Sequence, residues 1–393
     1  MTDKDSQRPL FETDALDTVR DSLDRAGTKG DDRPTVIDLF CGCGGLSKGF
    51  EDAGYRILLG IDHDEAALNT YNHNFRRSGA RGVSIDLFDR EYIKQLRKQL
   101  GGQAVDVIVG GPPCQGFSLT GPRNFDDERN RLYLAVFEAV EALKPKAFLI
   151  ENVKGMKTLY GGAIKDEIVA RFTGAGYVLP EPRVLCSADY GVPQIRERLF
   201  FVGIRKDLVP FDYPRPSHDP KRYVTCEQAI GDLPSLAVDL GEEESAYMSP
   251  ATSAYQKRMR RKSKGVLLNH VATRHTDLVK SVIRLVPEGG NHKDLPPGVG
   301  ESRKFNEAWT RYHSQRPSRT IDTGHRNHFH YEFDRVPTVR ENARLQSFPD
   351  DFQFIGTKTQ QNRQVGNAVP PMLAEAIARE ILKSISPEKK AKK

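Results

Sequence analysis

The stretch TVIDLFCGCGG, residues 35–45, decides the fold that we predict for this chain. Its first six residues are apolar or β-branched apart from Asp38, which is typical of a buried parallel strand. Glycines then break the strand, and a helical pattern follows from Leu46 to Asp52. A strand, a glycine turn and a helix N-terminus bring backbone N–H groups against a nucleotide-like ligand. The sequence therefore predicts a Rossmann-like α/β domain.

The next two predicted strands each end at an aspartate. One spans residues 56–61 and ends at Asp62, 18 residues after Gly44, and the other lies around 83–85 and ends at Asp86. A carboxylate at the position of Asp62 can accept hydrogen bonds from both ribose hydroxyls. Asp86 is placed to meet an adenine amino group.

The glycine turn alone is shared by enzymes that use NAD, FAD or S-adenosylmethionine. The spacing Gly42-x-Gly44-x-x-Ser47 lacks the third glycine of the dinucleotide fingerprint. No cluster for nicotinamide chemistry follows it. The pattern therefore favours S-adenosylmethionine.

A second informative stretch is GGPPCQGFS, residues 110–118, which follows the apolar run 105–109. The run reads as another buried strand, so Cys114 falls just beyond a strand's carboxyl end, where open α/β sheets place their chemistry. Two prolines fix φ before the thiol and glycines let the backbone approach a ligand. We expect a presented nucleophile here, and a buried structural cysteine is the alternative.

Two further stretches carry candidate acid–base and cationic groups. Glu151 follows the apolar strand 147–150, where we expect it to open a loop and desolvation to raise its pKa. A helix-capping or salt-bridged glutamate is the alternative. Alternation sends Gln194, Arg196 and Arg198 to one face of an extended segment, where guanidinium groups could hold a carbonyl oxygen or pin a loop. A solvated strand end is the competing interpretation.

Composition limits the class of protein. The 393 residues lack both an apolar run of about 20 residues and a signal-peptide pattern, so we expect a cytoplasmic protein. Five cysteines without paired spacing argue against a disulfide framework or a zinc ribbon. We also expect no metal at His325, His328 and His330, because no cysteine or carboxylate pattern accompanies them. The formal net charge of +6 permits a polyanionic partner.

Changes of character along the chain predict its domains. We expect a poorly ordered extension over 1–33, a catalytic domain over 34–205 completed by 360–386, a smaller target-recognition domain over 206–359, and a basic tail over 387–393. The C-terminal helix, residues 372–383, should pack back on the large domain. Six of the eight residues from 257 to 264 are Lys or Arg, which is either a solvated face or a phosphate contact.

Taken in order, six stretches of this chain resemble the DNA (cytosine-5)-methyltransferases of prokaryotes. They are Asp38-Leu39-Phe40-x-Gly42-x-Gly44-Gly45, Pro112-Pro113-Cys114-Gln115, Glu151-Asn152-Val153, Gln194-x-Arg196-x-Arg198, Arg340-Glu341-x-Ala343-Arg344-Leu345-Gln346 and Gly366-Asn367-x-Val369-Pro370. The resemblance spans roughly 34 to 383 except a variable region between about 206 and 315. It departs from the family pattern at Asp62, His63 and Ala368.

The resemblance implies methyl transfer from S-adenosylmethionine to carbon 5 of a flipped-out cytosine in a specific double-stranded DNA sequence. Cys114 would add to C6 of the base, Glu151 would share a proton with N3, and Arg196 and Arg198 would bind the O2 edge, with Gln194 in the same motif. It implies cofactor contacts at Asp38, Phe40, Gly42, Cys43, Gly44, Gly45, Asp62, His63, Asp86, Leu87, Pro113, Leu132, Asn367, Ala368 and Val369. We predict DNA contacts at Gln115, Ser118, Lys257, Arg258, Arg260 and Arg261.

Three rivals stay open at the level of sequence. An RNA cytosine-5 methyltransferase would use the same site chemistry, although a sizeable variable region favours duplex DNA. A binding protein that lost catalysis is opposed by intact Cys114, Glu151 and Arg196. A nicotinamide oxidoreductase leaves the Pro-Pro-Cys loop unexplained. A cognate restriction endonuclease is an open partner, and we expect a monomer.

Overall fold

The computed structural model describes residues 31–113, 131–299, 308–324 and 327–386. The chain divides into two units, Met1–Arg33 and Pro34–Lys393, and the second unit is described below. Most of the predicted extension (1–30) and the basic tail (387–393) lie outside the described residues.

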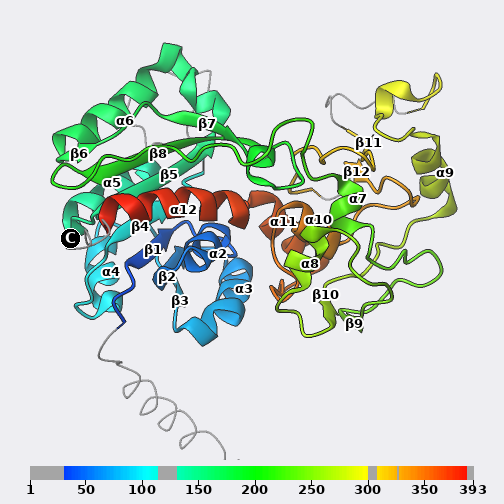
Figure 1. Cartoon of the computed structure of the whole chain (residues 1–393), viewed down its shortest axis with the longest axis horizontal. Coiled ribbons are helices and arrows are strands. Elements are labelled where there is room, and N and C mark those ends of the chain that lie inside the picture. The colour runs from blue at the N-terminus through cyan, green and yellow to red at the C-terminus, as the bar shows by residue number, and fades with distance from the viewer. Residues whose placement is uncertain (1–30, 114–130, 300–307, 325–326, 387–393) are drawn as a thin grey trace, which may run out of the picture. The chain divides into compact units, whose positions relative to one another are not determined.

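The main sheet is mixed and holds eight strands (Figure 1). They are β1 (Thr35–Leu39), β2 (Arg56–Asp62), β3 (Arg81–Ser84), β4 (Val107–Gly110), β5 (Ala147–Val153), β6 (Tyr177–Val178), β7 (Arg183–Cys186) and β8 (Glu197–Arg205). The strand order is β3-β2-β1-β4-β5-β8-β6, and β7 also pairs with β8. The five strands from β3 to β5 are parallel, whereas β8 runs antiparallel to β5. The predicted Rossmann-like fold is confirmed.

Helices cover both faces of this sheet. They are α2 (Gly45–Asp52), α3 (Glu65–Phe75), α4 (Tyr92–Leu100), α5 (Arg131–Leu143), α6 (Ala163–Gly174) and α12 (Pro371–Ile385). Successive strand residues point to opposite faces. In β1, Val36 joins the core formed with α2, α3 and α12, whereas Ile37 joins the core formed with α4, α5 and α6. Burial on both faces explains the uninterrupted apolar runs of these strands.

Helix α12 returns the end of the chain to the sheet, as expected from the sequence. Pro371 suits its first turn, and Leu373, Ile377 and Ile381 form a stripe that is fully buried. The helix packs against α2, and the Tyr55 hydroxyl donates a hydrogen bond to the carbonyl of Ala378 (2.9 Å). The segment preceding α12 is thereby held at the sheet.

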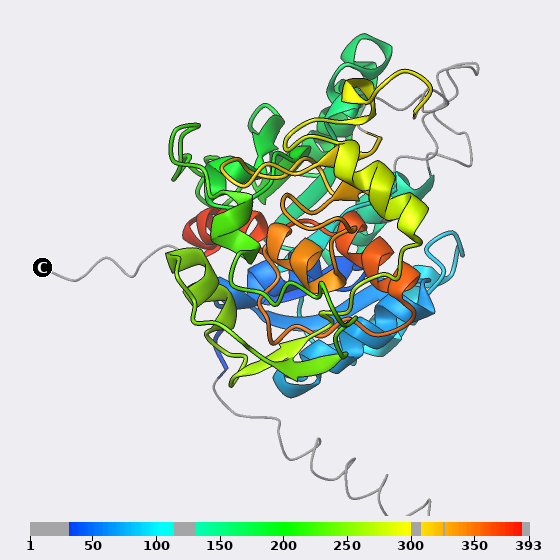
Figure 2. The ribbon, with the colours of Figure 1, turned by 90° about the vertical axis from the view of Figure 1, so that its right-hand side faces the viewer.

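The region between residue 206 and α12 is built of short elements. They are α7 (Cys226–Ile230), α8 (Ala254–Arg260), α9 (Asp277–Leu285), α10 (Val339–Leu345), α11 (Lys358–Asn367), the pair β9 (Glu244–Ala246) and β10 (Val266–Leu268), and the pair β11 (Thr310–Arg311) and β12 (His328–Phe329). In Figure 2, α8 and α9 lie on either side of α10 and α11. Two small cores lie in this region, whereas Val339 and Ala343 of α10 and Val365 of α11 join the core of the main sheet. The domain boundaries near 206 and 359 stay predictions.

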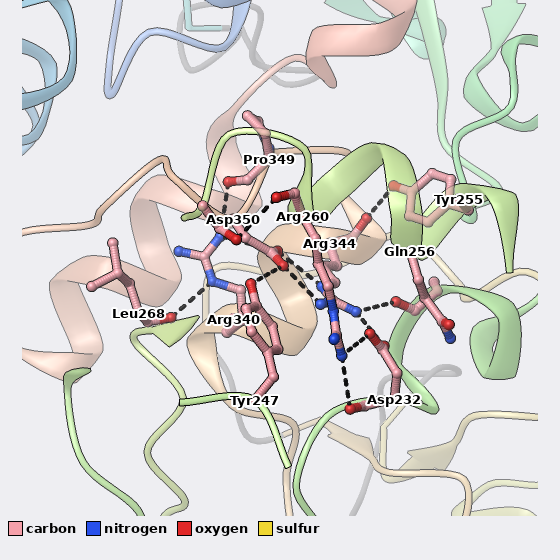
Figure 3. Close-up of polar contacts among 12 residues, drawn as sticks. Asp232, Tyr247, Tyr255, Gln256, Arg260, Leu268, Arg340, Arg344, Pro349 and Asp350 are labelled. Carbon is pink, nitrogen blue, oxygen red and sulfur yellow. Dashed lines mark hydrogen bonds and ion pairs between the residues drawn. The ribbon is translucent and has the colours of Figure 1, made fainter. Parts of the chain in front are cut away.

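A buried polar network holds these short elements together (Figure 3). The Arg344 side chain is fully buried and donates to both carboxylate oxygens of Asp350 (2.9 and 2.7 Å), to the carbonyl of Ala229 (3.0 Å) and to Asp232. Arg260 pairs with the same Asp232. Buried charges need such partners, so the network fixes α7, α8 and α10 relative to one another. None of the described helices is long and apolar enough to cross a membrane.

Candidate active site

Three predicted motifs meet at one edge of the sheet. Parallel neighbours end at the same edge, and the strand register places Leu39 level with Gly110 and Gly110 level with Ile150. The residues that follow β1 and β4 therefore lie beside Glu151, near the end of β5. This is the edge at which open α/β sheets bind their ligands.

The glycine turn after β1 is tied to the end of β2 by a carboxylate. Asp62 accepts hydrogen bonds from the backbone N–H of Gly42 (2.8 Å), His63 (2.8 Å) and Asp64 (2.9 Å). Phe40 enters the turn with a positive φ of 62°, which is uncommon for a bulky residue and is typical of functional sites. A Cβ on Gly45 would lie 2.3 Å from the carbonyl oxygen of Val369. Only glycine at this position therefore lets the segment around Val369 lie against the turn.

Asp38 lies buried below the same turn. One carboxylate oxygen accepts hydrogen bonds from the backbone N–H (3.1 Å) and the hydroxyl (2.7 Å) of Ser47. The other oxygen is buried and has no hydrogen-bond partner among the described residues. Burial raises the pKa of Asp38 to about 7. An unsatisfied buried acceptor beneath an open glycine turn fits a ligand that carries amino and hydroxyl donors, as S-adenosylmethionine does.

The other residues predicted for the cofactor differ in their exposure. Asp86 and Asn367 are exposed, the His63 side chain is 87% exposed, and Leu87 is buried. Cys43 instead packs in the core, where its sulfur lies 3.6 Å from the carbonyl of Gln364. Pro113 is exposed and Ala368 is half-buried. The side chain of Leu132 lies outside the described residues.

Glu151 lies inside β5 and does not open a loop, because β5 continues to Val153 in pairing with β8. Its carboxylate is 3.0 Å from Nε of Arg198, and its side chain is 12% exposed. Burial raises the pKa of Glu151 although Arg198 and Arg196 lower it. A Cβ on Gly111 would lie 3.2 Å from this carboxylate, so Glu151 borders the Gly111-Pro112-Pro113 segment.

Arg196 is buried beside this pair and has spare donors. Its Nη2 reaches the carbonyl of Asn367 at 3.5 Å, but Nε and Nη1 are buried without hydrogen-bond partners among the described residues. Burial, with a contribution from Arg198, lowers the pKa of Arg196 to about 9. Unsatisfied guanidinium donors next to a carboxyl group can bind a neutral carbonyl oxygen and an adjacent ring nitrogen.

Gln194 has its hydrogen-bonding groups engaged within the protein. Its amide donates to the carbonyl of Leu345 (3.2 Å) and to the side chain of Gln346 (2.5 Å), and its oxygen accepts from the backbone N–H of Ile321 (3.2 Å). Gln194 therefore ties the Arg196 segment to α10 and to residue 321.

The predicted DNA contacts differ in their surroundings. Arg260 lies inward, pairing with Asp232 and stacking over the Tyr247 ring, and Arg258 pairs with Glu375 of α12 (2.6 Å). Lys257 and Arg261 are exposed. The cysteine proposed as nucleophile, Cys114, and the predicted DNA contacts Gln115 and Ser118 lie outside the described residues.

Two site residues were missed from the sequence. Asn152 donates to the carbonyl of Pro112 (3.2 Å) and so fixes the segment that leads to Cys114. Ser47 orients Asp38. Asn152 stands within the Glu-Asn-Val motif and Ser47 within the spacing of the turn, so their positions were visible although their partners were not.

Comparison with known proteins gives one consistent family. A family model described as C-5 cytosine-specific DNA methylase matches residues 34–383. The chain is 39% identical over 356 residues to the type II methyltransferase M1.HphI of Haemophilus parahaemolyticus. The match covers 89% of this chain and 87% of that protein. It is 36% identical over 372 residues to the type II methyltransferase M.DdeI of Desulfomicrobium norvegicum, and the match covers 88% of each protein.

Solved structures agree with this result. A prophage-encoded protein of E. coli, described as a DNA modification methyltransferase, has a TM-score of 0.72 and 30% identity and covers 89% of this chain and 99% of that one. DNMT2 of Spodoptera frugiperda, at 16% identity and a TM-score of 0.56, shares the fold; the match covers 89% of this chain and 98% of that one.

Proposed function

Since the chain belongs to the C-5 cytosine-specific DNA methylase family, we propose that it methylates a flipped-out cytosine through a covalent bond from Cys114 to C6. Its general activity is DNA cytosine-5 methyl transfer. The finer proposal is supported chiefly by one observation. A buried carboxyl with a raised pKa lies between two guanidinium groups and the Gly111-Pro112-Pro113 segment that leads to Cys114.

Carbon 5 of cytosine is a poor nucleophile, so the ring needs activation before methylation. The Cys114 thiolate adds to C6, and the electrons of the C5–C6 double bond move toward N3 and make C5 nucleophilic. After C5 is methylated, its proton leaves to water or hydroxide. Those electrons re-form the double bond and expel the thiolate.

Glu151 and the two arginines stabilise the charge that this addition places on the ring. Glu151, whose pKa is raised by its burial, donates a hydrogen bond or its proton to N3. The spare donors of Arg196 bind O2, and Arg198 holds Glu151 in position.

S-adenosylmethionine, when bound, supplies the methyl group as an electrophile. We propose that the turn from Phe40 to Gly45 holds its methionine part, that Asp62 binds the ribose hydroxyls and Asp86 the adenine. The Asp62 carboxylate is held in place by the hydrogen bonds that it accepts from three backbone N–H groups. Pro113, Leu132 and the segment Asn367–Val369 complete the proposed pocket.

The target base must leave the duplex, because neither face of its ring is reachable in stacked DNA, and unstacking costs a few kcal/mol. Contacts from Gln115 and Ser118 and from the exposed Lys257 and Arg261 would help to hold the DNA. Because the relatives are named type II methyltransferases, a restriction endonuclease that cuts the same sequence is the partner that we propose.

The deciding experiment is methyl transfer from labelled S-adenosylmethionine to unmethylated genomic DNA and to total RNA in parallel, followed by nucleoside analysis. We expect 5-methylcytosine in DNA alone, and bisulfite sequencing then identifies the target sequence. Label in RNA alone would favour the RNA methyltransferase instead. Label in neither substrate, with cofactor and DNA still bound, would contradict the proposed activity.

A further inference from the structure

A cavity of about 310 Å³ adjoins the segment that carries Arg196. Its lining includes Ile195, which stands between Gln194 and Arg196 in the sequence, together with Tyr223, Tyr312, His313, Arg316 and Arg319. None of these lining residues belongs to the predicted catalytic or cofactor set. The cavity is large enough for one sugar and its phosphate.

Three hydrogen bonds join this cavity's lining to the segment that carries Arg196. The N–H of Ile195 donates to the carbonyl of Ser318 (2.9 Å), the N–H of Ser318 donates to the carbonyl of Pro193 (2.9 Å), and the Thr320 hydroxyl donates to the carbonyl of Ile195 (2.9 Å). The arginine-bearing turn around residues 316–319 is therefore held directly against the segment that precedes β8 and carries Arg196.

The cavity is cationic and partly apolar. Arg316 and Arg319 are exposed on its lining, whereas Arg311 is buried and donates to the carbonyls of Ile283 (2.6 Å) and Val286 (2.8 Å). The nearby carboxylates of Asp189 and Glu288 already accept hydrogen bonds from Tyr223 (2.5 Å) and Ser314 (2.6 Å).

Tyr312, one of the lining residues, carries a buried hydroxyl. Tyr312 is 2% exposed, and its hydroxyl has no hydrogen-bond partner within the described part of the chain.

We propose that this cavity binds one deoxyribose-phosphate unit of the substrate DNA next to the flipped cytosine. The inference rests on the proposed function and adds a contact to it. Arg316 and Arg319 bind the phosphate, and Ile195 and the ring of Tyr223 contact the sugar. The site reads no base. Its role is to strengthen binding of the DNA strand beside the active site.

The test compares Arg316→Ala with Arg316→Lys on an unmethylated duplex that carries the target sequence of the enzyme. For Arg316→Ala we expect a KM for DNA about tenfold higher and a slope of log affinity against log salt smaller by about 0.9, the value for one phosphate contact. The turnover at saturating DNA and the affinity for S-adenosylmethionine should stay within twofold of wild type. Arg316→Lys, which keeps the charge, should restore the slope.

Arg77→Ala is the matched control, because Arg77 is exposed on the short helix Arg76–Ser78 beside β3, away from the proposed site. It should change neither the slope nor the KM. Arg319→Ala provides a second variant if Arg316→Ala melts at a lower temperature. An unchanged salt slope with KM within twofold overturns the inference, as does a loss of turnover at saturating DNA with KM unchanged. If wild-type protein already fails to methylate DNA, the proposed function fails instead.

Discussion

Glu151 is the residue at which burial and charge oppose each other most directly. Burial raises the pKa of Glu151 against the effect of two arginines, so protonation costs this carboxyl less than it costs an exposed one. We predict that Glu151→Gln lowers turnover by about 10²- to 10⁴-fold, the usual contribution of general acid–base catalysis. Single-turnover kinetics with labelled cofactor measure this.

Glu91→Gln is a matched control for that variant, because Glu91 is exposed at the start of α4. It should leave turnover unchanged, and both variants should bind S-adenosylmethionine as wild type does. Wild-type turnover in Glu151→Gln would remove this carboxyl from the mechanism.

Because of Asp38, we predict that the stability of the folded protein depends on pH. Its pKa of about 7 in the folded protein lies above the ordinary value of 3.8, so between these values the folded state holds a proton that the unfolded state has lost. The free energy of unfolding should therefore fall as pH rises through this window, by at most about 1.4 kcal/mol per pH unit from this group. Chemical denaturation of the cofactor-free protein from pH 4 to 8 measures the effect.

Asp38→Asn removes the titrating group and keeps an oxygen that can accept from Ser47. Its stability should depend less steeply on pH than that of wild type over the same window. Parallel curves for the two proteins would show that Asp38 does not titrate there.

The chemistry of a side chain could be predicted from the sequence where a motif identifies the residue. It could not be predicted where the direction of the side chain depends on packing against distant residues. Glu151 follows a fully apolar strand, so its desolvation could be predicted from the sequence. The inward direction of Arg260 could not, because its partner Asp232 stands 28 residues away in the chain. The side chain of Cys43 packs in the core, and its contact with the cofactor stays a prediction.

At the scale of elements, the contact of α2 with α12 depends on one glycine. A Cβ on Gly49 would lie 2.4 Å from Cβ of Ala374 and 2.6 Å from the carbonyl oxygen of Pro371. Gly49→Ala should therefore push the helices apart and lower the free energy of unfolding by about 1–3 kcal/mol. Denaturant unfolding measures this loss.

Gly155→Ala is the control for this change, since a Cβ there meets nothing within 4 Å. It should leave stability within about 0.5 kcal/mol of wild type. Equal stabilities for the Gly49 and Gly155 variants would mean that α12 can shift freely on α2.

The positions of the helices and strands could be predicted from apolar runs and glycine breaks in the sequence. The direction of each strand in the sheet could not. The runs of β5 and β8 look alike in sequence because both are buried on both faces, yet they pair antiparallel. This pairing also extends β5 past Ile150 and keeps Glu151 in the sheet. The short strands β6 and β7 carry no apolar run that predicts them.

At the scale of the whole second unit, the Arg344 network joins parts of the chain that are far apart in sequence. Arg344→Met should lower the free energy of unfolding by about 3–5 kcal/mol, because it leaves Asp232 and Asp350 buried without their main cation. Denaturant titration and DNA binding should both report the loss.

Arg379→Met is the control, because that side chain is 57% exposed and its ion pair with Glu375 lies within one helix. It should cost at most about 0.5 kcal/mol. If Arg344→Met is no less stable than this control, the network does not hold the short elements together. The motif around Arg344 was visible in the sequence, whereas its partners at 232 and 350 were set by the fold alone.

The central claim is the covalent bond between Cys114 and the target base, and a trapping experiment tests it most directly. DNA synthesised with 5-fluorocytosine cannot lose a proton from C5 after methylation, so the thiolate cannot be expelled. With S-adenosylmethionine present, we predict a denaturant-resistant protein–DNA adduct whose modified peptide contains Cys114, and no adduct with Cys114→Ser. Methylation of ordinary DNA by Cys114→Ser at the wild-type rate, or an adduct at another residue, would contradict the account.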